Sequence, residues 1–146
     1  MKLNNNQTMF VRFQRLRMAI PEIKTTEVLN NLITKFLDKK HVEYNNLKKG
    51  LNYEWRAYWY VNAWLNKKNF NYSIFLSDLK SDLKGIDLYA VSNKENDGDK
   101  ANVEFRFQIK PKGQDIDAAD FPLVTHFILV GKNFIQVVKR DNLNNL

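Results

Sequence analysis

The stretch that decides the fold is residues 84–110, which read KGIDLYAVSNKENDGDKANVEFRFQIK. Apolar and polar residues alternate at both ends of this stretch, and residues that are two apart share one face of a pleated strand. The polar residues 92–101 in its middle are rich in Asn, Asp and Gly, which favours a hairpin turn. We therefore expect two strands with these apolar faces: Ile86, Leu88 and Ala90 in the first, and Val103, Phe105, Phe107 and Ile109 in the second.

Three polar side chains come together if these strands pair as a hairpin. Asp87 in the first strand then lies beside Gln108 and Lys110 in the second. An acid, an amide and an ammonium on adjacent strands form a cradle for a divalent metal ion and an attacking water, because Mg²⁺ takes oxygen ligands and keeps several of its own waters. The hairpin therefore predicts a candidate catalytic site.

The same residues carry a resemblance to a known family. Residues 85–87 (GID) and 108–110 (QIK) resemble the motif of the PD-(D/E)xK nuclease superfamily, and most closely its Mrr-like branch, in which Gln can replace the Glu of the motif. Residues 49–54 (KGLNYE) are similar to the helix that precedes these strands in the family, whose glutamate often joins the metal site. The resemblance covers roughly residues 48–112. It departs from the pattern where Ile86 stands in place of Pro, and where Gln108 in place of Glu removes one formal charge from the site.

This resemblance implies a metal-dependent endonuclease that hydrolyses phosphodiester bonds in double-stranded or branched DNA. Asp87 would be the central ligand of Mg²⁺, for which Mn²⁺ can substitute, and the side-chain oxygen of Gln108 and the backbone carbonyl of Ile109 would complete the protein's share. Glu54 would bind a second ion or hold a metal-bound water. Lys110 would orient or deprotonate the attacking water. One or two such ions can also neutralise the phosphate and stabilise the leaving oxygen.

The biological role stays open within that class. A restriction enzyme, a homing endonuclease, a junction resolvase and a mobile-element nuclease all fit the resemblance. A compact nuclease without a separate DNA-reading domain would form a homodimer in order to cut both strands.

Two helices are expected before the hairpin. Thr25 or Thr26 can cap a helix over residues 26–40, whose apolar residues fall on one stripe. A second helix over residues 47–67 carries Glu54 and an aromatic face, which we interpret as core packing rather than as a platform for stacking bases.

The N-terminal segment gives a weaker pattern. Residues 1–8 are polar and expected to be frayed. Residues 9–17 alternate loosely, which indicates either a strand or a basic arm. Its arginines form either a solvated face or a set of phosphate contacts: Arg12, Arg15 and Arg17.

The remaining elements complete a sheet. The predicted segments are a strand over 69–76, a short helix over 114–120, strands over 124–130 and 133–139, and a disordered tail over 141–146. The order of elements predicts an α/β (α+β) fold with a central mixed sheet flanked by helices. It resembles a restriction endonuclease-like core with an extra N-terminal helical segment. We expect a single domain over residues 1–146, in which 1–45 are the addition and 46–140 the core.

Composition narrows the function classes. The chain of 146 residues contains no Cys, which excludes disulfides and thiolate metal sites. Its two histidines, His41 and His126, are interpreted as a helix-end residue and a packed strand residue. Its sequence contains no run of the length that spans a membrane and no signal-peptide core, so we expect a cytoplasmic protein without a membrane partner.

The charge leaves three functions in competition. A formal net charge of +7 suits a polyanionic partner, because neutralised phosphates release counterions, although it also serves solubility alone. Besides the nuclease, the chain could be a catalytically inactive nucleic-acid-binding module of the same fold, which Gln108 favours. It could also be a basic protein-interaction domain, in which Asp87 and Lys110 form a salt bridge.

Overall fold

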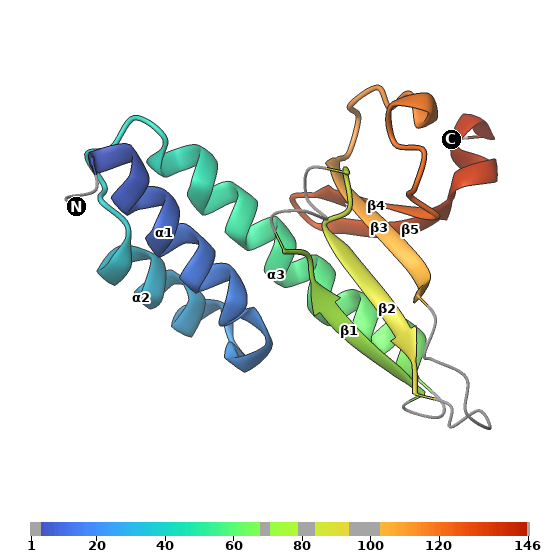
Figure 1. Ribbon diagram of the computed structural model, residues 1–146, viewed down its shortest axis with the longest axis horizontal. Helices are drawn as coiled ribbons and strands as arrows, with labels where there is room; N and C mark the ends of the chain where they lie inside the picture. Colours follow the sequence, from blue (N-terminus) through green and yellow to red (C-terminus); the bar gives the residue numbers. More distant parts are fainter. Residues whose placement is uncertain (1–3, 68–70, 79–83, 94–102, 146) are drawn as a thin grey trace. The chain divides into compact units, whose positions relative to one another are not determined.

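The computed structural model describes residues 4–67, 71–78, 84–93 and 103–145. The chain forms two compact units, Met1–Arg56 and Ala57–Leu146, and the boundary between them falls within helix α3 (Tyr44–Asn66). The second unit contains a five-stranded mixed sheet, and the N-terminal segment is helical (Figure 1). This arrangement confirms the predicted α+β fold class. That the whole chain is one domain stays a prediction.

Helix α1 (Asn5–Met18) occupies the segment that was predicted as frayed residues and a strand or basic arm. Asn4 accepts a hydrogen bond from the N–H of Gln7 at 2.8 Å, and the side chain of Gln7 accepts one from the N–H of Asn4 at 2.9 Å. This capping box satisfies two of the free N–H groups at the helix start. Met9 and Leu16, which are buried and seven residues apart, lie on one face. The prediction was wrong because the cap and this two-turn spacing outweigh the loose alternation.

Helix α2 (Thr26–Phe36) begins as predicted and ends four residues earlier. The hydroxyl of Thr25 accepts a hydrogen bond from the N–H of Val28 at 3.2 Å. Leu37 is buried with an extended backbone, and Asp38 then accepts from the N–H of Lys40 at 3.0 Å. That local bond turns the chain before the predicted end of the helix. A 3₁₀ turn, η1 (Ile20–Glu22), joins α1 to α2.

Helix α3 begins at Tyr44, three residues before its predicted start. His41, predicted at the end of the preceding helix, instead lies in the turn before α3, where its Nδ1 lies 3.0 Å from the N–H of Glu43. The N-terminal part of α3 packs with α1 and α2, and the indole N–H of Trp55 donates to the carbonyl of Ile23 at 2.7 Å. Among the described residues, no helix is long and apolar enough to cross a membrane.

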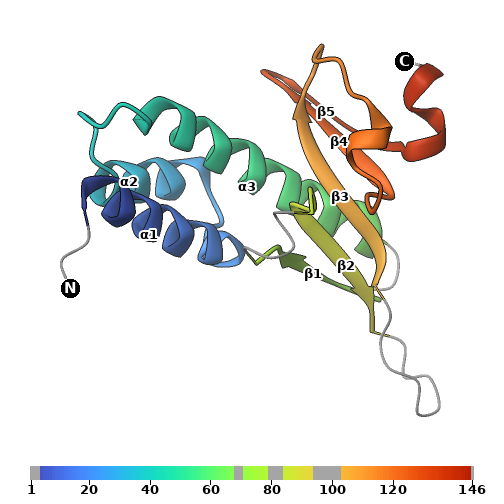
Figure 2. The same cartoon turned by 45° about the horizontal axis from the view of Figure 1, so that its top comes forward.

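The sheet has its strands in chain order: β1 (Tyr72–Leu76), β2 (Leu88–Ser92), β3 (Val103–Pro111), β4 (His126–Gly131) and β5 (Phe134–Lys139). Strands β1, β2 and β3 pair antiparallel, β3 and β4 pair parallel, and β4 and β5 form an antiparallel hairpin (Figure 2). Residues 94–101 of the predicted loop over 92–101 and the first two residues of the predicted strand over 69–76 lie outside the described residues, and Ser92 belongs to β2. The strand predictions are otherwise confirmed, with shifts of a few residues at their ends.

The parallel pairing of β3 and β4 requires a crossover, and this crossover is not the predicted helix. Within residues 114–120 only Ala118–Asp120 forms a 3₁₀ turn, η2. Arg140 donates hydrogen bonds to the carbonyls of Ala118, Phe121 and Val124. The side chain of Arg140 thus bonds three carbonyls of this irregular segment.

The tail is also ordered, contrary to the predicted disorder. Arg140–Asn145 forms a 3₁₀ helix, η3, that lies next to the crossover in both views (Figures 1 and 2). Leu143 is buried in a cluster with Ile86, Val124 and Phe127. Burial of a leucine side chain contributes on the order of 2 kcal/mol, which helps to hold this segment in place.

The other face of the sheet carries an aromatic cluster. Ring centroids of Trp64, Phe105 and Phe107 lie 5.0–6.0 Å from that of His126. The imidazole Nδ1 of His126 lies 2.9 Å from the hydroxyl of Thr125. This confirms the interpretation of His126 as a packed strand residue.

We expect His126 to make the second unit less stable in mild acid. Burial lowers its pKa below the ordinary value of 6.5, and the charge of Lys139 lowers it further. The unfolded chain therefore binds a proton first as the pH falls below about 6.5, so the free energy of unfolding decreases down to the lowered pKa. Urea unfolding at pH 7.5 and 5.5 should show a larger loss for the wild type than for His126→Gln. Equal losses in the two proteins would contradict this assignment.

Candidate active site

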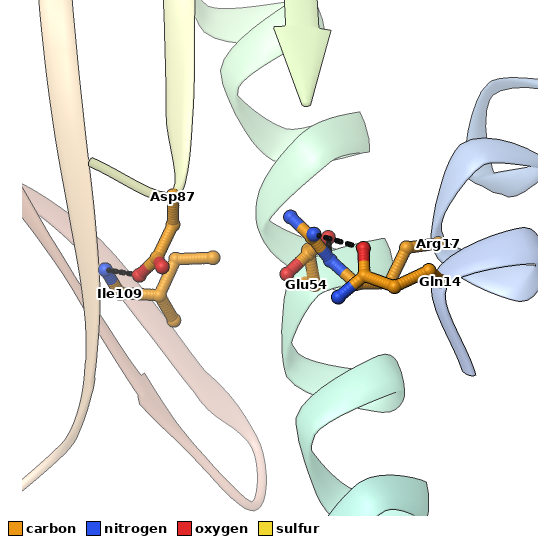
Figure 3. Close-up of polar contacts among 5 residues, drawn as sticks. All are labelled: Gln14, Arg17, Glu54, Asp87 and Ile109. Carbon is orange, nitrogen blue, oxygen red and sulfur yellow. Dashed lines mark hydrogen bonds and ion pairs between the residues drawn. The ribbon is translucent and has the colours of Figure 1, made fainter. Parts of the chain in front are cut away.

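The hydrogen bonding between β2 and β3 becomes irregular at Asp87, the residue before β2. Leu88 pairs with Phe107, but the backbone N–H of Asp87 also donates to the carbonyl of Phe107, at 2.8 Å. The carbonyl of Asp87 accepts from the N–H of Ser77 at 3.0 Å. Its carboxylate Oδ2 accepts from the N–H of Ile109 at 2.8 Å (Figure 3). Asp87 therefore holds the strand ends together with its side chain as well as its backbone.

This irregularity corrects one detail of the predicted strand. Ile86 was expected to share a face with Leu88 and Ala90. Ile86 instead packs with Phe127. Phe127 is paired with Gln108, and it therefore lies on the face opposite Phe107, the partner of Leu88. The cause is Gly85, whose φ of +80° turns the chain immediately before the strand.

Gln108 and Lys110 lie on one face of β3, because they are two residues apart in a paired strand. The Nε2 of Gln108 donates to the carbonyl of Ile109 at 3.3 Å. Its Oε1 is buried and has no hydrogen-bond partner among the described residues. The half-buried Lys110 places its ammonium 4.8 Å from the ring centroid of Phe121.

Phe121 belongs to this site although the sequence did not point to it. A Cβ placed on Gly85 would lie 2.7 Å from the ring of Phe121 and 3.8 Å from the Oε1 of Gln108. One ring from the crossover thus covers Gly85 and faces the ammonium of Lys110, which is a cation–π arrangement. In the sequence, the one notable feature of Phe121 is that it precedes Pro122, and this feature does not predict a functional role.

Glu54 belongs to the N-terminal unit, whereas the other predicted site residues belong to the second unit. Its Oε1 accepts a hydrogen bond from the Nε of Arg17 at 2.6 Å, and both side chains are buried (Figure 3). Arg17 also donates to Gln14 at 2.9 Å. The prediction of a solvated face or phosphate contacts is therefore wrong for Arg17, while Arg12 and Arg15 are exposed.

Arg17 is a residue that sequence reasoning missed as a partner of Glu54. The two residues are 37 positions apart, so no local pattern connects them. The Nη2 of Arg17 is buried without a hydrogen-bond partner in the described part of the chain. A buried carboxylate with a guanidinium partner is a structural ion pair by default, and a role for Glu54 in binding metal stays a prediction.

The oxygen atoms of Asp87, Gln108 and Ile109 are of the types that bind a hard cation such as Mg²⁺. Asp87 offers a carboxylate, Ile109 a carbonyl, and Gln108 a buried amide oxygen that has no hydrogen-bond partner in the described part of the chain. Oxygen donors of these types are the ones that Mg²⁺ takes, and it needs few of them because it keeps waters. Within the described ranges, no group of three or more His, Asp or Glu side chains is arranged to hold an ion. The protein's share would therefore be one charged and two neutral oxygens.

Comparison of the chain with protein-family models, with characterised proteins and with solved structures finds no match. The interpretation of the site therefore depends on the residues themselves and on the local resemblance of their motifs.

Alanine substitutions at three glycines measure how much the close approach of the Phe121 ring to Gly85 affects stability. Gly85→Ala places a methyl group against Phe121 at a φ of +80°, so we expect a loss of more than about 1–2 kcal/mol of stability. Gly113→Ala has a φ of +88° but open space, and should lose only the strain energy. Gly50→Ala, inside α3 with no atom nearby, should gain about 0.5–1 kcal/mol. Urea unfolding measures all three, and equal losses at Gly85 and Gly113 would exclude an effect of Phe121.

A double-mutant cycle tests whether Glu54 and Arg17 act as one unit. Arg17→Met alone removes the guanidinium that pairs with the buried carboxylate of Glu54, which should cost about 3–5 kcal/mol. Arg17→Met combined with Glu54→Met replaces both charges with apolar groups and should cost less than the single change. Additive losses in urea unfolding would show that the pair is not coupled.

Proposed function

We propose that this protein is a metal-dependent endonuclease of the PD-(D/E)xK type, with Asp87, Gln108 and Lys110 in its active site and DNA as its substrate. The observation that carries the proposal is the Oε1 of Gln108, a buried acceptor without a hydrogen-bond partner among the described residues. Leaving such an atom unpaired costs about 1–3 kcal/mol. A bound cation at this point would offset that cost, and the carboxylate of Asp87 is held nearby by the residue that follows Gln108.

Each residue has a distinct part in the proposed reaction. Asp87, the Oε1 of Gln108 and the carbonyl of Ile109 would hold Mg²⁺, which supplies Lewis-acid activation of the phosphate and of a water. The N–H of Ile109 fixes the orientation of the Asp87 carboxylate. The ammonium of Lys110 donates hydrogen bonds to the attacking water or to a phosphate oxygen, and the ring of Phe121 limits where it can point.

A second candidate function is a nucleic-acid-binding module without catalysis. Its support is that Asp87 is the only charged ligand that the second unit contributes from the predicted set, since Gln108 is neutral. The third candidate expected a salt bridge between Asp87 and Lys110. The carboxylate of Asp87 accepts a hydrogen bond from the backbone N–H of Ile109, and the ammonium of Lys110 lies against the ring of Phe121. A steep fall of DNA affinity with salt would separate nucleic-acid binding from a protein-interaction role.

Cleavage of supercoiled plasmid DNA in Mg²⁺ or Mn²⁺, compared with EDTA, tests the proposal. Asp87→Asn removes the charged ligand, and Lys110→Ala removes the group that prepares the water, which should lower the rate by about 10²–10⁴-fold. DNA binding should persist, because each change alters only one charge. Asp141→Asn and Lys132→Ala alter matched exposed charges away from the site and should leave cleavage unchanged. Metal-dependent cleavage that survives both site changes would exclude this assignment.

Gln108→Glu gives the same experiment a readout that does not need catalysis. It adds a carboxylate where the present oxygen is buried without a donor, so the metal-free variant should be less stable than the wild type. Mg²⁺ should then raise its melting temperature more than it raises that of the wild type. An active site should stay active with this substitution, and a site that has lost catalysis should regain weak cleavage. A melting temperature that Mg²⁺ changes in neither protein would argue against a metal at Gln108.

A further inference from the structure

A cavity of about 490 Å³ lies beside the candidate active site within the second unit. Its apolar wall consists of Leu129 on β4, Phe134 on β5 and Leu143 on η3. Leu143 also packs in the cluster that contains Ile86, so this wall continues the core under the Asp87 corner. The volume lies in the range of pockets that hold small organic ligands.

The rim of the cavity is polar and close to neutral. Gln114 and Gln136 each offer a carboxamide, which donates and accepts hydrogen bonds at once. Lys112 holds its ammonium 4.0 Å from the ring centroid of Phe134, and the carboxylate of Asp115 balances that charge in the same lining. A free polyanion does not match such a rim, whereas a flat, uncharged ring with donors and acceptors at its edge does.

The cavity is connected to Lys110 through the register of the sheet. Lys110 is paired with Leu129, and Leu129 is paired with Gln136, so the three residues form one row on one face. Neighbouring strands are about 4.8 Å apart, which places Gln136 roughly 10 Å from Lys110 across the sheet. That span is comparable to the distance from the phosphate to the far edge of the base within one nucleotide.

We propose that this cavity binds one unstacked nucleobase, whose own or neighbouring phosphate lies at Lys110. The identity of the ligand rests on the proposed nuclease function, while the shape and chemistry of the cavity do not. Phe134 and Leu129 contact the faces of the base, and the carboxamides of Gln114 and Gln136 contact its hydrogen-bonding edge. Enzymes that act on DNA accommodate extruded bases in pockets of this kind, in which apolar side chains stack and polar groups read the edge.

Titration of the 146-residue chain with mononucleotides tests the cavity without DNA cleavage. The probes are the four deoxynucleoside 5′-monophosphates, with deoxyribose 5-phosphate and inorganic phosphate as base-free controls. We expect a nucleotide to shift the side-chain amide NMR signals of Gln114 and Gln136, and the base-free probes to leave them in place. Gln136→Phe fills the cavity from an exposed strand position and should weaken binding at least tenfold. Lys132→Gln changes the β4–β5 turn outside the cavity and should leave binding unchanged.

The outcomes separate this proposal from the nuclease. Shifts of equal size with deoxyribose 5-phosphate would overturn it in favour of a phosphate site, and so would the absence of shifts at millimolar nucleotide. Binding that Gln136→Phe leaves intact would place the nucleotide elsewhere and also overturn it. Nucleotide binding without plasmid cleavage would support the cavity and count against the nuclease. Plasmid cleavage by a protein that binds no nucleotide would support the nuclease and overturn the proposed base-binding cavity.

Discussion

The hydrogen bond from the N–H of Ile109 to the carboxylate of Asp87 is the contact on which the candidate site depends. In a regular antiparallel pair a backbone carbonyl would accept from that N–H group, and the strands would continue side by side. Here a side chain takes the place of the carbonyl. The regular ladder between β2 and β3 ends at the pair Leu88 and Phe107, the last backbone bond comes from the N–H of Asp87 to the carbonyl of Phe107, and the chain before it turns at Gly85.

The space that this turn creates is filled by the crossover. Phe121 enters beside Gly85, and the ammonium of Lys110 lies against the same ring. The crossover has little regular structure of its own, so its position depends on cations that bond its carbonyls. Arg140 bonds three of them, and the Nε of Arg106 donates to the carbonyl of Leu123. Packing, strand geometry and the polar site are therefore parts of one arrangement.

Features encoded by neighbouring residues could be predicted from the sequence. The strand that carries Gln108 and Lys110 follows from alternation, and the start of α2 follows from the hydroxyl of Thr25. Residues 9–17 were misassigned because this segment shows a loose alternation with a period of two, whereas the cap that starts the helix lies upstream at Asn4.

Features that depend on distant contacts could not be predicted. Arg17, which pairs with Glu54, is 37 residues away from it in sequence, and the ring over Gly85 comes from Phe121, which directly follows the predicted short helix over 114–120. The tail is polar except for two leucines, and the composition does not reveal that Leu143 is buried in the core cluster. The hairpin motif named Asp87, Gln108 and Lys110, but the buried unpaired oxygen of Gln108 is visible only after the strands are paired.

The guanidinium of Arg140 has a consequence for biosynthesis. Because a ribosome synthesises a chain from its N-terminal side, β3 and the crossover leave the exit tunnel before Arg140 does. The carbonyls of Ala118, Phe121 and Val124 have no Arg140 to bond during that interval, and Phe121 is not yet fixed over Gly85. The corner around Asp87 is therefore completed only after Arg140 has emerged. Until then the nascent chain would lack the finished arrangement of the candidate site.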